Sequence, residues 1–192
     1  MGASVYIETE RLILRDWREE DAPPFETMNA DARVMEFFPK PLIRSESDAS
    51  MAGIRAFLLD HGYGLYAAEE KSTGAFLGFI GLSRVPFEAP FTPATEIGWR
   101  LARTAWGSGY ATEGARAVLS DSFARLKFRE LVSFTAEWNM RSRGVMEKIG
   151  MRHDPDGSFL HPLLPPEHKL ARHVLYRVDA SPPRAAAGRA DA

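Results

Sequence analysis

Hydrophobic and polar positions follow two periodicities along this chain. Alternating or short continuous apolar runs predict strands over residues 5–17, 65–70, 76–84, 95–101, 130–138, 151–161 and 172–178. Apolar residues at helical spacing predict helices over residues 19–30, 31–38, 45–62, 111–126 and 139–149. Two signals set the topology. A turn signal at residues 71–74 predicts an antiparallel hairpin, and the strand–helix–strand crossover over residues 95–138 predicts a parallel pair. We expect an α+β fold: a mixed, mostly antiparallel sheet of about seven strands with helices on both faces.

Local signals mark where several of these elements begin and end. Pro39 and Pro41 stop the helix predicted over residues 31–38, and the capping-box pattern at residues 45–48 starts the next one. Gly150 ends the helix over residues 139–149. Residues 181–192 are rich in Ala, Pro and Gly, so we expect a disordered tail after a single domain over residues 1–180.

Composition excludes several function classes. The formal net charge of −2 predicts no nucleic-acid partner and no anionic membrane partner, and no uncharged apolar run is long enough to span a membrane. The chain has no cysteine, which removes disulfides, thiolate metal sites and a cysteine nucleophile and fits a reducing cytoplasm. The spacing of the five histidines matches no metal motif, so we expect no metal.

The most informative segment is the glycine turn at residues 104–114, which follows a predicted strand and opens a predicted helix. Such a turn exposes backbone N–H groups at the positive end of a helix dipole and suits a phosphate or pyrophosphate. Thr112 stands where a dinucleotide fingerprint needs its third glycine, and the phosphate-loop lysine is missing too. The turn alone leaves nucleotides, phosphosugars and coenzyme A open.

Four motifs together make the chain similar to the GNAT superfamily of N-acetyltransferases, and most similar to its ribosomal-protein Nα-acetyltransferase branch. They are Thr9-Glu10-Arg11-Leu12-Ile13-Leu14-Arg15 with Asp21, Glu96-Ile97-Gly98-Trp99, Trp106-Gly107-Ser108-Gly109-Tyr110-Ala111-Thr112-Glu113, and Asn139 with Ser142, Glu147, Lys148 and Gly150. They occur in the family's order over about residues 6–178.

The resemblance implies a GNAT-like fold that binds acetyl-CoA as co-substrate, with the fourth and fifth predicted strands splayed apart. It implies that the turn from Trp106 to Thr112, namely Trp106, Gly107, Ser108, Gly109, Tyr110, Ala111 and Thr112, holds the pyrophosphate. The pantetheine arm would lie along Trp99, Arg100 and Leu101, with Asn139 and Ser142 nearer its thiol end. One departure is Thr104, where the superfamily often has Gln or Arg.

Acetyl transfer needs a neutral amine, an oxyanion donor and a protonated leaving thiol. Glu96 is the first candidate for the base and Glu137 the second; an ordinary exposed strand glutamate is the alternative for Glu96. Met146 occupies the place where many superfamily members have the tyrosine acid. Ser142 stands where the ribosomal-protein branch has a serine proposed for this role, so the resemblance implies Ser142 as the candidate acid, with a helix-cap role as the alternative. Without cysteine a cysteinyl acyl-enzyme is excluded, and direct transfer is the simpler scheme.

The acceptor is left open by the sequence. Phe87 and Phe91 are candidate acceptor-binding residues, because their loop runs into the strand of Glu96. Glu137, on the strand predicted over residues 130–138, is a third candidate. Three functions stay in play: acetylation of a protein N-terminus, acetylation of a small amine such as an amino acid, polyamine or aminoglycoside, and a non-catalytic acyl-CoA-binding module. Since family members are often dimers, a homodimer is a further expectation.

Overall fold

A computed structural model describes residues 4–180; the tail predicted at 181–192 lies outside the described residues. One eight-stranded sheet has the order β1-β2-β3-β4-β5-β6-β8-β7. Its strands are β1 (Val5–Glu8), β2 (Leu12–Arg15), β3 (Leu65–Glu70), β4 (Phe76–Arg84), β5 (Thr95–Leu101), β6 (Glu130–Ala136), β7 (Arg152–Leu160) and β8 (Arg172–Asp179). The helices are η1 (Glu19–Asp21), α1 (Ala22–Ala30), α2 (Arg44–His61), η2 (Arg103–Ala105), α3 (Tyr110–Ala124) and α4 (Met140–Lys148). All neighbouring strands are antiparallel except β5 and β6, which confirms the expected mixed sheet.

Two of the predicted elements are wrong. The single strand expected over residues 5–17 is a hairpin of β1 and β2, because Thr9 turns the chain and its N–H donates to the Leu12 carbonyl at 3.0 Å. The sheet therefore has eight strands. Residues 31–38 form turns and no helix: the Asp31 carboxylate accepts the Arg33 N–H at 2.8 Å, which competes with helical pairing.

The start of α2 also differs from the capping box predicted at residues 45–48. The helix begins at Arg44, and the Glu46 carboxylate accepts the Ile43 N–H at 3.1 Å. Glu46 is therefore the capping acid, and the box lies nearer the N-terminus than the Ser45–Asp48 pattern indicated.

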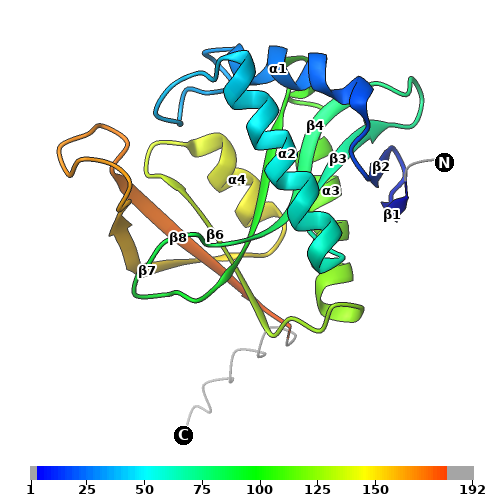
Figure 1. Cartoon of the computed structure of the whole chain (residues 1–192). Helices are drawn as coiled ribbons and strands as arrows, with labels where there is room; N and C mark the ends of the chain where they lie inside the picture. Colours follow the sequence, from blue (N-terminus) through cyan, green and yellow to red (C-terminus); the bar gives the residue numbers. More distant parts are fainter. Residues whose placement is uncertain (1–3, 181–192) are drawn as a thin grey trace, which may run out of the picture.

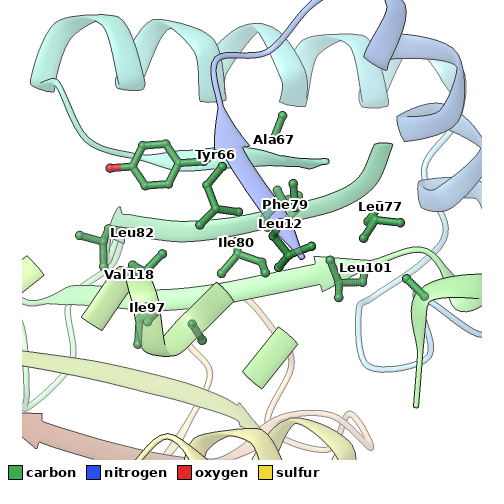
Figure 2. Packing of buried hydrophobic residues seen from close by; sticks show 14 of the residues in the cluster. Leu12, Tyr66, Ala67, Leu77, Phe79, Ile80, Leu82, Ile97, Leu101 and Val118 are labelled. Atoms are coloured by element: carbon green, nitrogen blue, oxygen red, sulfur yellow. The ribbon is translucent and has the colours of Figure 1, made fainter. Parts of the chain in front are cut away.

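Helices cover both faces of the sheet, as the sequence predicted (Figure 1). Phe79 packs against Trp17 and against Phe25 of α1, whereas the next residue of β4, Ile80, lies against Gly114 of α3. Successive strand residues point to opposite faces, so α1 and α3 lie on opposite sides. Figure 2 shows Ile80, Leu82 and Ile97 near Val118 of α3. This core holds β4 and β5 in place as the support for the residues at the open edge of β5.

The sheet opens between its two parallel strands. β4 and β5 are paired from Arg84↔Thr95 to Gly78↔Leu101, but β5 and β6 share a single pair of register partners, Glu96↔Val132. Beyond that pair the C-terminal halves of β5 and β6 diverge. The turn before α3 and the start of α4 both follow these diverging ends, so the splay brings the two chemical motifs of the sequence to one place.

A buried ion-pair cluster joins the start of α1 to the sheet. The Arg15 guanidinium donates to both oxygens of Asp21 at 2.7 and 2.8 Å, and its Nε donates to Glu69 at 2.7 Å. The side chains of Arg15 and Asp21 are 2% and 4% exposed. Arg15 thus compensates the negative charges of two carboxylates that are shielded from water. This pairing explains why Arg15 and Asp21 occur together in the N-terminal motif.

Candidate active site

The glycine turn has the geometry of an anion cradle. Gly107 and Gly109 have φ of 76° and 83°, a left-handed backbone conformation that residues other than glycine rarely adopt. After the turn, Glu113 is the first residue whose N–H is hydrogen-bonded; it donates to the Gly109 carbonyl at 3.0 Å. Within residues 4–180 the amides from Gly107 to Thr112 have no acceptor. These donors stand at the positive end of α3 and are available to an anion.

The N-terminal motif holds this turn in place. The Glu113 carboxylate accepts from the Thr9 hydroxyl at 2.6 Å and from the Arg11 N–H and Nε at 2.9 and 2.7 Å. Arg11 Nη1 also donates to the Ser108 carbonyl at 2.9 Å. Two motifs about a hundred residues apart therefore form one unit, in which Arg11 places a positive charge beside the turn.

A cavity of about 780 Å³ extends from the turn through the splay of β5 and β6. Most of the residues proposed from sequence line it: Glu96, Trp99, Arg100, Leu101, Trp106, Gly107, Gly109, Tyr110, Ala111, Thr112, Asn139 and Ser142. Ser108 does not line it. A smaller cavity of about 380 Å³ lies elsewhere, lined by Phe91, Arg84 and Arg129 but by no residue of the turn. The larger cavity is thus the one that brings the candidates together.

Glu96 is a half-buried carboxyl in the wall of the larger cavity. Burial raises its pKa from 4.5 to about 8, and no charged or hydrogen-bonding neighbour offsets this effect. The carboxyl is therefore largely protonated at neutral pH in the free protein. An exposed strand glutamate would keep an ordinary pKa, so that alternative does not describe Glu96. A carboxyl poised near neutral pH suits proton transfer.

Asn139 and Ser142 divide the two roles that the sequence left open. Asn139 is the N-cap of α4: its Oδ1 accepts the Ser142 N–H at 3.2 Å, and its Nδ2 donates to Thr135 Oγ1 at 2.9 Å. The cap uses the backbone of Ser142, so the Ser142 hydroxyl is not part of it. Ser142 lines the cavity, and its role as the acid stays a prediction.

The two phenylalanines proposed for acceptor binding stand behind the cavity wall. Phe87 packs on Phe134 and His161, with ring centroids 5.7 and 4.7 Å apart, and Phe91 packs on Phe134 at 5.9 Å. Phe134 and His161 themselves line the cavity, as does His173. Phe87 and Phe91 thus support the aromatic wall from outside, and a direct contact with the acceptor stays a prediction.

Burial favours the neutral form of the two histidines in this wall. Burial lowers the pKa of His173 to about 4 and lowers that of His161 as well. Their rings are 4.9 Å apart. The wall beside Glu96 therefore consists of uncharged aromatic rings.

Glu137, the second candidate base, lies outside the cavity wall. Its carboxylate pairs with Arg172 at 3.2 Å, and its carbonyl accepts from Arg143 at 3.1 Å. Glu96 is consequently the better placed of the two candidates for the base.

Sequence reasoning missed a contact between α4 and residues 34–39 beside the cavity. Arg141 of α4 pairs with Glu36 at 2.7 Å and lies 4.4 Å from the ring centre of Trp106. Residues 34 and 37–39 also line the cavity. The partners are 105 positions apart in the chain, so no local pattern could have revealed this contact.

A family model of the acetyltransferase (GNAT) domain matches residues 11–152, which include the turn, Glu96 and α4. The chain belongs to the GNAT acetyltransferase family. The resemblance to the GNAT superfamily inferred from the motifs is thereby confirmed, and this GNAT protein is an acyltransferase.

Relatives and solved structures agree with the family. The GNAT domain is 32% identical over 154 residues to the uncharacterized protein YkkB of Bacillus subtilis (strain 168), covering 80% of this chain and 88% of YkkB. It is similar to an acetyltransferase structure from Agrobacterium tumefaciens str. C58, with TM-score 0.71 and 28% identity, covering 93% and 94% of the two chains. A third match is RimL, a ribosomal L7/L12 alpha-N-protein acetyltransferase solved in complex with coenzyme A. Its TM-score is 0.73 at 16% identity, covering 92% of this chain and 98% of RimL. At that identity the likeness to RimL concerns the fold.

Two classes of feature are absent from the part of this GNAT chain that the structure describes. Among residues 4–180, no helix is long and apolar enough to cross a membrane. The same residues contain no group of three histidine, aspartate or glutamate side chains that could hold a metal ion.

Replacing Gly107 with alanine is expected to weaken coenzyme A binding by about tenfold or more. The new side chain would strain the left-handed backbone that aims the turn amides, and it would stand in the cavity wall. Titration calorimetry with coenzyme A measures the effect.

Gly74 provides a matched control for this variant. It has φ of 72° against 76° for Gly107, and an added Cβ meets no atom within 4 Å at either position. Gly74→Ala should therefore cost similar stability and leave coenzyme A affinity unchanged. Equal losses of affinity in both variants would contradict the assignment of the turn.

Proposed function

We propose that this GNAT protein transfers an acetyl group from acetyl-CoA directly to a primary amine, on a small molecule or a protein N-terminus, in the cytoplasm. The observation that carries the proposal is the single cavity that joins the donors of the glycine turn to a carboxyl with a pKa of about 8. An anion-binding turn alone would serve many ligands. A proton acceptor at the other end of the same cavity supports a transfer reaction.

The residues present fit coenzyme A. The unpaired amides from Gly107 to Thr112 would hold the pyrophosphate. The C-terminal half of β5 is paired with β4 on one edge only, as in Ile80↔Trp99, so the other edge is open to the amides of the pantetheine arm. That arrangement would direct the thioester toward Glu96.

The chemistry needs few groups. Glu96, as carboxylate, accepts a proton from the acceptor ammonium directly or through one water, and the neutral amine attacks the thioester carbonyl. The tetrahedral oxyanion is stabilised by a backbone N–H of β5. Its collapse breaks the C–S bond as the attacking nitrogen loses its second proton. That proton passes through the Ser142 hydroxyl to the leaving thiolate, which helps because a thiol pKa is roughly 8.5.

The proposal is tested by thiol release from acetyl-CoA across a panel of amino acids, polyamines, aminoglycosides and peptides with free N-termini. Acetylated product in any class supports it and identifies the acceptor class. Coenzyme A binding without turnover across the panel would favour the alternative, a non-catalytic acyl-CoA-binding module. Sedimentation of the same sample reports whether the protein is the expected homodimer.

Ser142→Ala is expected to lower kcat by about 10- to 100-fold with little change in coenzyme A affinity. The α4 cap should survive, because it uses the Ser142 N–H and the Asn139 side chain. Steady-state kinetics and thermal unfolding measure both properties.

Asn139→Ala is the matched variant for the cap. It removes the cap itself and should cost about 1 kcal/mol of stability. If Ser142→Ala loses stability and keeps its kcat, Ser142 is structural and the acid must be sought elsewhere.

A further inference from the structure

Arg100 is a partly buried cation without a carboxylate partner among the described residues. The side chain lines the large cavity from β5, and its Nε is buried with no hydrogen-bond partner within residues 4–180. Arg15, the fully buried arginine of the fold, is compensated by Asp21 and Glu69. Burying an uncompensated charge is unfavourable for stability. Arg100 is therefore a residue that folding alone does not explain.

The surroundings of Arg100 orient it without neutralising it. Its Nη1 donates to Asn29 Oδ1 at 2.8 Å, and the Asn29 amide donates in turn to Ser47 Oγ at 2.9 Å. The guanidinium lies 4.1 Å from the ring centre of Phe38 and 5.3 Å from that of Phe79. All of these partners are uncharged. Burial lowers the Arg100 pKa to about 10, so the group stays cationic at neutral pH.

An open path connects Arg100 to Glu96. The two residues are four positions apart on β5, so their side chains point to the same face and their Cα atoms are about 13 Å apart. Gly98 lies between them on that face, and a Cβ added there would meet only the Glu96 carboxyl, at 3.9 Å. An extended molecule can thus lie over Gly98 with one end at Glu96 and the other at Arg100.

We propose that Arg100 binds a carboxylate of the acetyl acceptor, so that the preferred acceptors are amines with a carboxylate several bonds away. This inference rests on the proposed acetyl transfer to the amine near Glu96. The guanidinium reaches the cavity and has only uncharged neighbours, so it offers charge-assisted hydrogen bonds to a carboxylate there. The carboxylate can come from a free amino acid or from an acidic side chain near a peptide N-terminus.

Paired acceptors test the proposal. The small-molecule arm compares 5-aminopentanoate with 5-aminopentanamide, and the peptide arm compares Ala-Glu-Ala-Ala with Ala-Gln-Ala-Ala, both C-terminally amidated. In at least one arm the wild-type protein should prefer the carboxylate by about 100-fold in kcat/KM. The arm that shows the preference identifies the source. Equal rates within both pairs overturn the proposal.

Variants assign the preference to Arg100. Arg100→Gln should abolish it through KM for the acceptor, with the affinity for coenzyme A unchanged. Arg103→Gln removes an exposed arginine of the same region, paired with Asp31 at 3.6 Å, and should keep the preference. A preference that survives in Arg100→Gln, or a loss confined to coenzyme A affinity, overturns the proposal.

A further variant and a binding readout keep the outcome decisive. If Arg100→Gln does not fold, Arg100→Lys should reduce the preference about tenfold, because lysine keeps the charge and loses the planar guanidinium. An unchanged preference counts against Arg100. Calorimetric binding of 5-aminopentanoate with coenzyme A present needs no turnover. Binding that Arg100→Gln removes, in a protein that acetylates nothing, would refute the proposed function and keep the carboxylate site.

Discussion

Replacing Glu96 with glutamine is expected to lower kcat by about 10²- to 10⁴-fold and to leave the Kd for coenzyme A within about twofold. Glutamine keeps the size of the side chain and removes its ability to accept a proton. The wild-type kcat/KM should rise as the pH increases through about 8, where the buried carboxyl ionises. In Glu96→Gln this rise should disappear. Initial rates from pH 6 to 10 measure both effects.

Glu137→Gln is the control for this prediction. Its carboxylate pairs with Arg172 outside the cavity wall, so the substitution should leave kcat nearly unchanged. A rate loss in Glu137→Gln, with normal rates in Glu96→Gln across the pH range, would make Glu137 the base.

The same Glu96 substitution has a signature in stability that does not depend on turnover. Between pH 4.5 and about 8 the folded protein holds a proton on Glu96 that the unfolded chain releases, so the Glu96 contribution to stability falls as the pH rises. A glutamine side chain does not titrate, so it makes no such pH-dependent contribution to stability. Glu96→Gln should therefore gain stability relative to wild type as the pH goes from 5 to 8. A constant difference in Tm between Glu96→Gln and the wild type across that range would show that burial does not raise the Glu96 pKa.

Replacing Arg15 with methionine is expected to lower the free energy of unfolding by about 3–5 kcal/mol. Asp21 would lose both of its guanidinium hydrogen bonds, and Glu69 would keep only its ion pair with Arg18. At roughly 2–4 °C per kcal/mol for a chain of this size, Tm should fall by about 6–20 °C. Differential scanning calorimetry measures the change.

Arg152→Met is the matched control, because Arg152 pairs with Asp179 at the same 2.7 Å distance but is exposed. An exposed pair contributes about 1 kcal/mol or less, so its Tm should move by a few degrees at most. Similar losses in the two variants would mean that the burial of Arg15 does not govern its contribution.

Sequence periodicity predicted the elements whose own residues decide their structure. Residues 65–70, 76–84 and 95–101 form β3, β4 and β5 with the expected bounds, and the crossover placed β5 parallel to β6. The failures lie where a local turn or a contact with the rest of the molecule competes with the apolar periodicity. Residues 31–38 bury Val34 and Met35 in the core from a series of turns, although their pattern suits a helix.

The candidate site divides in the same way. The glycine turn and the motif of Asn139 and Ser142 are local signals: the turn pattern indicated an anion site, and the family resemblance placed Asn139 and Ser142 beside it. Phe134 and Arg141 gave no such signal. They reach the cavity because β6 pairs with β5 and α4 packs against β6 and α3.

By itself the sequence determined the family, the anion-binding turn and the identity of Glu96 as the candidate base. Those conclusions depend on residue type and spacing, which a linear chain displays. Only the tertiary structure decided that burial raises the Glu96 pKa to about 8, that the helix cap uses the Ser142 backbone and not its hydroxyl, and that Arg100 lacks a compensating charge among the described residues. Desolvation and charge compensation depend on which groups face one another after folding, and the partner of Arg100, Asn29, is 71 positions away along the chain.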